Sequence, residues 1–221
     1  MAEKHFESIY IGNSNQLFVD DYLIESKKNI DLKLHNLTTV GTALELDAPW
    51  EGVTCDYHTV FQDDKIFRMY YRGSSHEGYA INSMLSLDEM VIKPHPEVMC
   101  YAESEDGINW IKPSLGLFEF DGSKDNNIVW MSETCDLVPF KDANPNSKED
   151  ERYKGTVWIK NSIFAVKSPD GLNWSLMMDK PILTDGPFDS QNVPMWDPFR
   201  SCYVIFTRGK VGQGGSFAGG Y

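Results

Sequence analysis

Three aspartates stand at comparable places in the sequence, each a few residues before an apolar run. Asp56 and Asp136 both follow a Thr-Cys pair, and Asp189 opens the segment Asp-Ser-Gln-Asn. Carboxyl groups that converge from equivalent positions could serve as a general acid and as a base or nucleophile. The alternative is that each aspartate caps a turn by accepting hydrogen bonds from nearby backbone.

The residues around these aspartates include aromatic rings, which offer flat apolar faces to a ligand, and polar groups that can hydrogen-bond to it. The candidates for substrate binding are Trp50, Glu51, Tyr57, His58, Arg72, Gln191, Asn192 and Arg208. Other roles stay open for several of them. Trp50 could be a core residue, His58 a core histidine, an acid or base, or a metal ligand, and the segment 189–192 a polar loop. Arg72 and Arg208, which recur at strand ends, either pair with the carboxylates or bind substrate.

A seven-residue pattern, Ser-x-Asp-Gly-x-Asn-Trp, occurs at 104–110 and again at 168–174. Its Asp-Gly pair suits a turn with positive φ, and the tryptophan would return on the next strand to cover the turn. The pattern therefore predicts two equivalent hairpins in which Trp110 and Trp174 are structural.

Short runs that alternate polar and apolar residues fill the rest of the chain and predict strands, including 17–24 and 30–35. We expect a long connection over 74–96, with one helical turn near 87–90, and a glycine-rich loop over 212–220. Repeats of about four short strands indicate an all-β fold of the β-propeller type. The first strands of successive blades line the axis, so the three acidic segments would face one another.

The predicted organisation is one incomplete propeller domain over 1–221. The expected parts are N-terminal strands in 1–48, a first blade in 49–126, a second blade in 127–186 and the start of a third in 187–221.

Composition excludes several classes of function. With 41% hydrophobic and 24% charged residues, the chain is typical of a globular protein. The net charge of −13 disfavours nucleic acid and membrane surfaces as partners. The histidines lack metal-ligand spacing, so we expect no metal and no cofactor. The four cysteines are far apart, which favours thiols over two disulfides, although an even number permits them.

The N-terminal residues contain no apolar core of a secretory signal. As written, the chain is expected to be cytoplasmic. A periplasmic or extracellular location is the alternative if a leader is missing.

The phrase Pro49-Trp50-Glu51-Gly52, the run 18–25, the paired turns and the segment 189–192 with Trp196-Asp197 carry a resemblance. The sequence resembles the five-bladed propeller glycoside hydrolases of families 32 and 43, in particular their bacterial members of unassigned activity. The resemblance implies five blades in the full-length protein, of which about two and a half to three are present here.

The same resemblance implies roles for the aspartates. An aspartate at the head of blade one is the nucleophile or base, which matches Asp56, and one in blade two stabilises the site, which matches Asp136. A glutamate in blade three is the general acid, but Glu151 is the last glutamate of the chain. Asp189 is then the nearby candidate, or the acid lies beyond residue 221.

The expected function is hydrolysis of a glycosidic bond in an oligo- or polysaccharide, with carbohydrate as the partner. Two alternatives belong to other classes: a propeller that binds carbohydrate without cleaving it, and a propeller that binds proteins. Because the third blade lacks its second half, we expect the chain to be inactive by itself.

Overall fold

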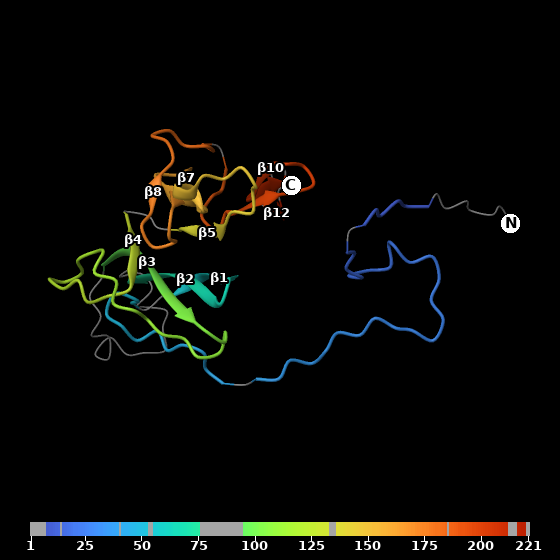
Figure 1. Cartoon of the computed structure of the whole chain (residues 1–221), viewed down its shortest axis with the longest axis horizontal. Helices are drawn as coiled ribbons and strands as arrows, with labels where there is room; N and C mark the ends of the chain where they lie inside the picture. The colour runs from blue at the N-terminus through green and yellow to red at the C-terminus, as the bar shows by residue number, and fades with distance from the viewer. Residues whose placement is uncertain are drawn as a thin grey trace. The chain divides into compact units, whose positions relative to one another are not determined.

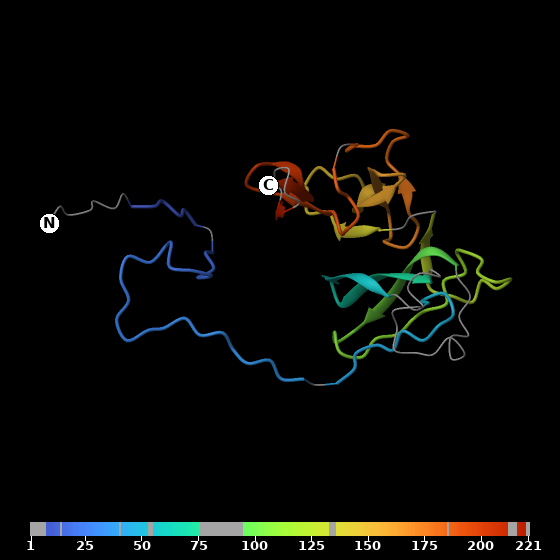
Figure 2. The ribbon, with the colours of Figure 1, turned by 180° about the vertical axis from the view of Figure 1, so that it is seen from behind.

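A computed structural model describes residues 8–13, 15–39, 41–52, 55–75, 95–132, 136–184, 186–211 and 216–219. The chain divides into two compact units, Met1–Gly41 and Thr42–Tyr221. The second unit contains every strand that the structure describes, all of them in antiparallel sheets (Figure 1, Figure 2). The predicted all-β class is therefore confirmed. Within the described residues, no helix is long and apolar enough to cross a membrane.

The first unit forms turns and irregular chain over its described residues. The strands predicted for 17–24 and 30–35 are therefore wrong. Their apolar side chains lie in solvent, with Leu17 81% and Leu34 95% exposed. Alternation favours a strand only where a neighbouring strand completes the hydrogen bonds and a core covers the apolar face. The described part of this unit provides neither.

The first sheet has four antiparallel strands in chain order: β1 (Asp56–Asp63), β2 (Ile66–Ser75), β3 (His95–Ser104) and β4 (Ile128–Met131). The first repeat thus takes its last strand from beyond the predicted boundary at residue 126. The connection from β2 to β3 covers 76–94, so the helical turn predicted near 87–90 lies outside the described residues.

The second sheet repeats this order with β5 (Val138–Lys141), β6 (Tyr153–Ile159), β7 (Ser162–Ser168) and β8 (Ser175–Leu176). A short 3-10 helix, Glu149–Glu151, precedes β6. Lys160 and Asn161 join β6 to β7 with positive φ at both positions, the geometry of a tight type I′ hairpin.

Two further strand pairs follow: β9 (Val193–Asp197) with β10 (Cys202–Phe206), and β11 (Arg208–Val211) with β12 (Ser216–Gly219). The loop predicted for 212–220 is wrong over 216–219, because backbone pairing with β11 makes this glycine-containing segment a strand. Arg208 begins β11 and does not end the preceding strand.

The seven-residue pattern forms the same turn both times, as predicted. The carboxylate of Asp106 accepts hydrogen bonds from the backbone N–H groups two and three residues later, at 2.8 and 2.7 Å. Asp170 repeats both bonds at 2.8 Å. In each turn the tryptophan indole donates to the carbonyl of the turn glycine, at 3.2 and 2.9 Å. These bonds satisfy the backbone of the turn locally, which explains why the pattern can recur.

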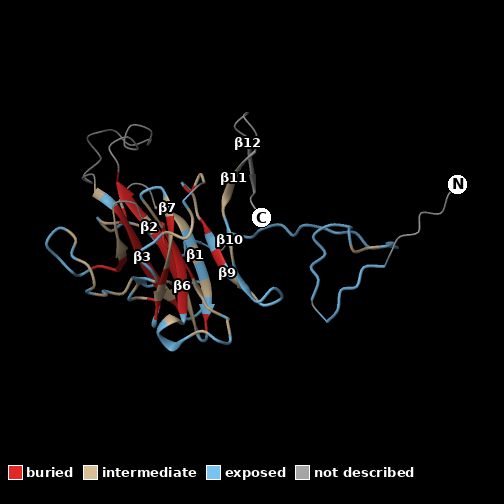
Figure 3. Ribbon diagram, turned by 90° about the horizontal axis from the view of Figure 1, so that it is seen from above, coloured by how far each residue is buried: buried red, intermediate tan, exposed pale blue. Residues whose placement is uncertain are grey.

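Strand β2 contributes to two cores because its side chains alternate between the faces of the first sheet. Met69 and Tyr71 pack on one face with residues of β3. Tyr70, on the other face, packs with Val157 and Val166 of the second sheet. Figure 3 shows buried residues along β2, β3 and β6. Arg68, Tyr70 and Arg72 therefore share the face that meets the second sheet.

The first strands of the successive sheets lie together, since β5 contacts both β1 and β9. Two four-stranded antiparallel sheets with adjacent first strands agree with part of a propeller. The described residues do not form a closed ring, so the propeller remains an expectation.

The two turn glycines differ in what surrounds them, which predicts a difference in stability. Both have positive φ, so alanine costs roughly 1–2 kcal/mol at either position. At Gly171 an added Cβ would also lie 2.8 Å from the Tyr70 hydroxyl and 2.9 Å from Arg68 Nη1, whereas at Gly107 the nearest atom is 3.5 Å away. We expect Gly171→Ala to lower the free energy of unfolding by about 1–3 kcal/mol more than Gly107→Ala, measured by urea denaturation. Equal losses would contradict this packing.

Candidate functional site

Arg72 and Asp56 face each other at one end of the first sheet. They are paired directly across β1 and β2. The guanidinium donates from Nε to Asp56 Oδ1 and from Nη2 to Asp56 Oδ2, each at 2.8 Å. This bidentate geometry is the strongest pairing that an arginine makes with a carboxylate. Asp56 keeps 44% of its side chain exposed, so it remains available to a ligand.

The third nitrogen of the same guanidinium reaches two further carboxylates. Arg72 Nη1 lies 3.2 Å from Asp136 Oδ1 and 3.3 Å from Glu97 Oε1. Asp136 stands just before β5, so this contact joins the two sheets. The four residues Asp56, Arg72, Glu97 and Asp136 are called the Arg72 cluster below. Two carboxylates that share one guanidinium lie within the roughly 10 Å that glycosidic cleavage requires of its carboxyl pair.

Asp136 is the most buried carboxylate of the cluster, with 3% of the residue exposed. Its second oxygen, Oδ2, is buried without a hydrogen-bond partner among the described residues. Burial raises the pKa of Asp136 to about 6; the Arg72 guanidinium opposes this shift, and the charges of Glu97 and Asp56 add to it. Near neutral pH this carboxyl therefore changes between its protonated and ionised forms.

Tyr57 links the Arg72 cluster to the segment that begins at Asp189. Its φ is 54°, and the pairing of β1 with β2 shifts register between Asp56 and Thr59. Such a bulge redirects a side chain at a cost in backbone strain. The Tyr57 ring lies 4.4 Å from the Arg72 guanidinium carbon, and its hydroxyl donates to the Asp189 carbonyl at 3.3 Å.

Asp189 lies beside this tyrosine, but its carboxylate is held by Arg208 in an ion pair. The side chain of Asp189 is 61% exposed. Gln191 donates to Thr59 Oγ1 at 3.2 Å, which ties the segment 189–192 to β1. Arg72 and Arg208 are thus both paired with aspartates. Pairing with the carboxylates was one of the two roles that the sequence left open for them.

Asn192 holds the loop in place and is not available to a ligand, since only 2% of it is exposed. Its side-chain amide nitrogen donates to the Phe188 and Ser190 carbonyls, and its backbone carbonyl accepts from Thr156 Oγ1 at 2.6 Å. The structure thus places Asn192 inside the loop, with almost no exposed surface for the substrate contact that the sequence predicts.

Trp50 and Glu51 lie on the opposite face of the first sheet, away from the Arg72 cluster. Glu51 is 0% exposed. Its carboxylate accepts from the Tyr71 hydroxyl at 2.5 Å and from the Lys112 ammonium at 3.1 Å. The Trp50 indole donates to Asn127 at 2.6 Å and packs on the core. Sugar contact by Glu51 is excluded because it has no surface, and Trp50 takes the core role that the sequence left open.

His58 is exposed and stacks on Tyr71, with ring centroids 5.5 Å apart. Burial of part of the ring lowers its pKa, and the charge of Asp56 opposes this shift. His58 therefore lies on the face of the first sheet that carries Tyr71, opposite the Arg72 side chain. No group of three or more His, Cys, Asp or Glu side chains among the described residues could hold a metal ion.

The described cysteines are thiols. Of the described cysteines, Cys55, Cys100 and Cys202 lie outside any disulfide, whereas Cys135 is not among the described residues. Burial raises the pKa of the Cys55 thiol to about 12, and the charge of Glu51 adds to the shift. This thiol is therefore protonated and a poor nucleophile near neutral pH.

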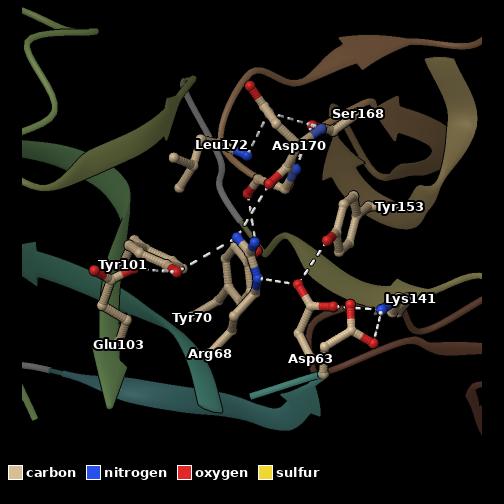
Figure 4. Close-up of polar contacts among 12 residues, drawn as sticks. Asp63, Arg68, Tyr70, Tyr101, Glu103, Lys141, Tyr153, Ser168, Asp170 and Leu172 are labelled. Atoms are coloured by element: carbon tan, nitrogen blue, oxygen red, sulfur yellow. Dashed lines mark hydrogen bonds and ion pairs between the residues drawn. The ribbon is translucent and has the colours of Figure 1, made fainter. Parts of the chain in front are cut away.

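Arg68 forms a second arginine cluster at the other end of the same face of β2 (Figure 4). It donates to Asp63 at 2.5 Å and to the Asp170 carbonyl at 3.0 Å. Asp63 also accepts from Tyr153 and from Lys141, each at 2.6 Å. Although burial opposes the shift, these donors lower the pKa of Asp63 to about 2. Because each charge is matched, this cluster joins the two sheets and offers no reactive group.

Glu97 is the member of the Arg72 cluster that the sequence analysis missed. It is the third residue of β3 and directly precedes an apolar run, as Asp56 does at the start of β1. An acidic residue immediately before a buried strand was the available signal. The sequence analysis missed Glu97 because this residue has no equivalent in the Thr-Cys-Asp repeat.

Comparisons with known proteins do not assign the chain to a family. No protein family matches the sequence, and neither does any curated protein. A glycosyl hydrolase from Bacteroides ovatus is similar in structure, with a TM-score of 0.42 and 18% identity over 75% of this chain and 46% of that one.

Two further solved structures are similar at the same level. One comes from work stating that the GH130 family of mannoside phosphorylases contains glycoside hydrolases that target β-1,2 mannosidic linkages in Candida mannan. It has a TM-score of 0.42 and 17% identity over 75% of this chain and 46% of that one. The other is a glycoside hydrolase, with a TM-score of 0.41 and 15% identity over 74% of this chain and 51% of that one. The chain thus spans about half the length of these structures, and likenesses at such TM-scores carry no argument about its fold or activity.

The raised pKa of Asp136 predicts that stability depends on pH. A carboxyl that binds its proton more tightly in the folded state stabilises the fold below its unfolded pKa, and this contribution is lost as pH rises through about 6. We expect Asp136→Asn to gain roughly 2 kcal/mol relative to wild type between pH 4 and pH 7, measured by denaturation at each pH. Asp121→Asn, which changes an exposed aspartate, should follow wild type. Parallel curves for Asp136→Asn and wild type would refute the assignment.

Proposed function

We propose that this chain forms part of a glycoside hydrolase site in which Asp56 is the base or nucleophile. The observation that carries the proposal is the Arg72 cluster, where an exposed carboxylate and a buried, proton-binding carboxyl share one guanidinium. Glycosidic cleavage needs carboxyl groups in different protonation states held at a fixed separation. The resemblance of the sequence to propeller glycoside hydrolases supports the same chemistry.

Asp56 is suited to the ionised role because a bidentate arginine stabilises its charge. Its carboxylate would take a proton from an attacking water, or attack the sugar carbon itself. Asp136 is too buried to reach a sugar in this conformation, so it would act through Arg72, as the resemblance implies for a stabilising residue. Tyr57, beside both, would present an aromatic edge at the rim.

The charge of the site favours an uncharged sugar as substrate. Asp56, Glu97, Asp136 and Asp189 bring four carboxyl groups, and Arg72 and Arg208 are both paired with them. With a net charge of −13 on the chain, a uronic acid or a sulfated sugar would be repelled.

The second candidate function is sugar binding without cleavage. Asp189, the aspartate proposed as general acid, is exposed, but its pairing with Arg208 favours the ionised form. Asp136 binds a proton but is buried. Among the described residues of the cluster and the segment 189–192, no exposed carboxyl is thus arranged to hold a proton for a leaving group.

One substitution separates these functions. If Asp56 is the base or nucleophile, Asp56→Asn in the full-length protein that the resemblance implies should lower hydrolysis of a panel of uncharged aryl glycosides and oligosaccharides by at least about 10²-fold. Asp121→Asn, which removes the same charge from an exposed turn, should leave the rate unchanged. Calorimetry with the same oligosaccharides should show binding in both variants. Binding without turnover by wild type would favour the second candidate, and neither binding nor turnover would remove both.

A further inference from the structure

Neither the Thr-Cys-Asp repeat nor the family resemblance assigns a role to Glu97. It lies on β3, is 8% exposed and contacts Arg72 Nη1 at 3.3 Å. Asp136 contacts the same nitrogen at 3.2 Å. Asp56 occupies the opposite edge of the guanidinium, at Nε and Nη2. Arg72 is thus divided between one exposed carboxylate and two buried ones.

Among the described residues, the titratable groups that face Asp136 are Asp56 and Tyr57 of β1, Arg72 of β2 and Glu97 of β3. Arg72 lies within ion-pair distance of all three carboxylates. Burial disfavours the ionised form of Asp136, and the nearby negative charges of Glu97 and Asp56 disfavour it further.

We propose that Glu97 is a positioning residue, which occupies Nη1 together with Asp136 and thereby keeps the bidentate edge of Arg72 on Asp56. The proposal rests on the function proposed for Asp56. Glu97 does not touch a substrate. It acts by deciding which carboxylate receives the positive charge of Arg72.

Two observations explain why Asp136 takes the proton. Its Oδ2 is buried without a partner among the described residues, so ionisation leaves a lone pair unsatisfied. Glu97 also adds a negative charge that raises the pKa of Asp136, after burial as the larger cause and against the opposing effect of Arg72. While Asp136 is protonated, Arg72 remains paired with Asp56 through both nitrogens and keeps that carboxylate aligned.

The test measures the titration of Asp136 directly, by ¹³C NMR of the side-chain carboxyl groups in the whole chain. Glu97→Gln keeps the shape of the side chain and removes its charge, so the midpoint of Asp136 should fall by about one pH unit. Glu97→Asp keeps the charge and should restore a midpoint near that of wild type. Glu105→Gln, an exposed neighbour after β3, should leave the midpoint unchanged. An unchanged or raised midpoint in Glu97→Gln overturns the proposal.

Activity provides the second measurement. In Glu97→Gln the limb of the pH–rate profile that follows Asp136 should move toward acid by the same amount as the NMR midpoint. If the midpoint moves but no glycoside is hydrolysed by any variant, the positioning by Glu97 stands and the proposed function fails. If hydrolysis occurs and the limb does not move, Glu97 has no part in positioning.

If Glu97→Gln does not fold, the proposal is tested by NMR of the wild-type protein. Glu97 contacts the same guanidinium nitrogen as Asp136, so the ¹³C chemical shift of its carboxyl should change as Asp136 titrates near pH 6. A Glu97 chemical shift that does not change near pH 6 overturns the proposal.

Discussion

The guanidinium of Arg72 contacts three carboxylates, and the candidate site depends on these contacts. The guanidinium joins Asp56 of β1 and Glu97 of β3 to the start of the second sheet at Asp136. Breaking a buried ion pair by removing one partner typically costs about 3–5 kcal/mol. The same side chain therefore joins the two sheets and orients Asp56, the only exposed carboxylate in the cluster.

Arg68 and Arg72 show how one strand face can serve two purposes. Both project from β2 toward the second sheet, four residues apart. Arg68 meets an aspartate whose donors hold its pKa near 2, so that this aspartate stays ionised over the whole working range of pH. Arg72 contacts Asp136, where burial, with the charges of Glu97 and Asp56 added, outweighs the guanidinium and raises the pKa to about 6. Perturbed carboxyls of the second kind are typical of functional sites.

The sequence predicted features that local chemistry decides and missed those that depend on distant segments. The paired turns follow from an Asp-Gly at fixed spacing, because their hydrogen bonds close within seven residues. The pairing of Asp56 and Asp136 on one residue follows from the repeat. Nothing local reveals that Glu51 faces Tyr71 and Lys112, which lie 20 and 61 residues away. The prediction of strands in the first unit was wrong for the same reason, because alternation of polar and apolar residues cannot show whether a neighbouring strand exists.

The turn that ends at Trp174 also has a consequence for how the molecule unfolds. The Trp174 ring packs edge-on against Tyr70 of the first sheet at 6.2 Å, and the Tyr70 hydroxyl donates to Gly171 in the same turn at 2.8 Å. The second repeat therefore completes its own turn with a side chain of the first. Units in a repeat array often unfold one by one when their contacts are weak. Here the shared turn couples the two sheets, so we expect them to unfold in one cooperative transition.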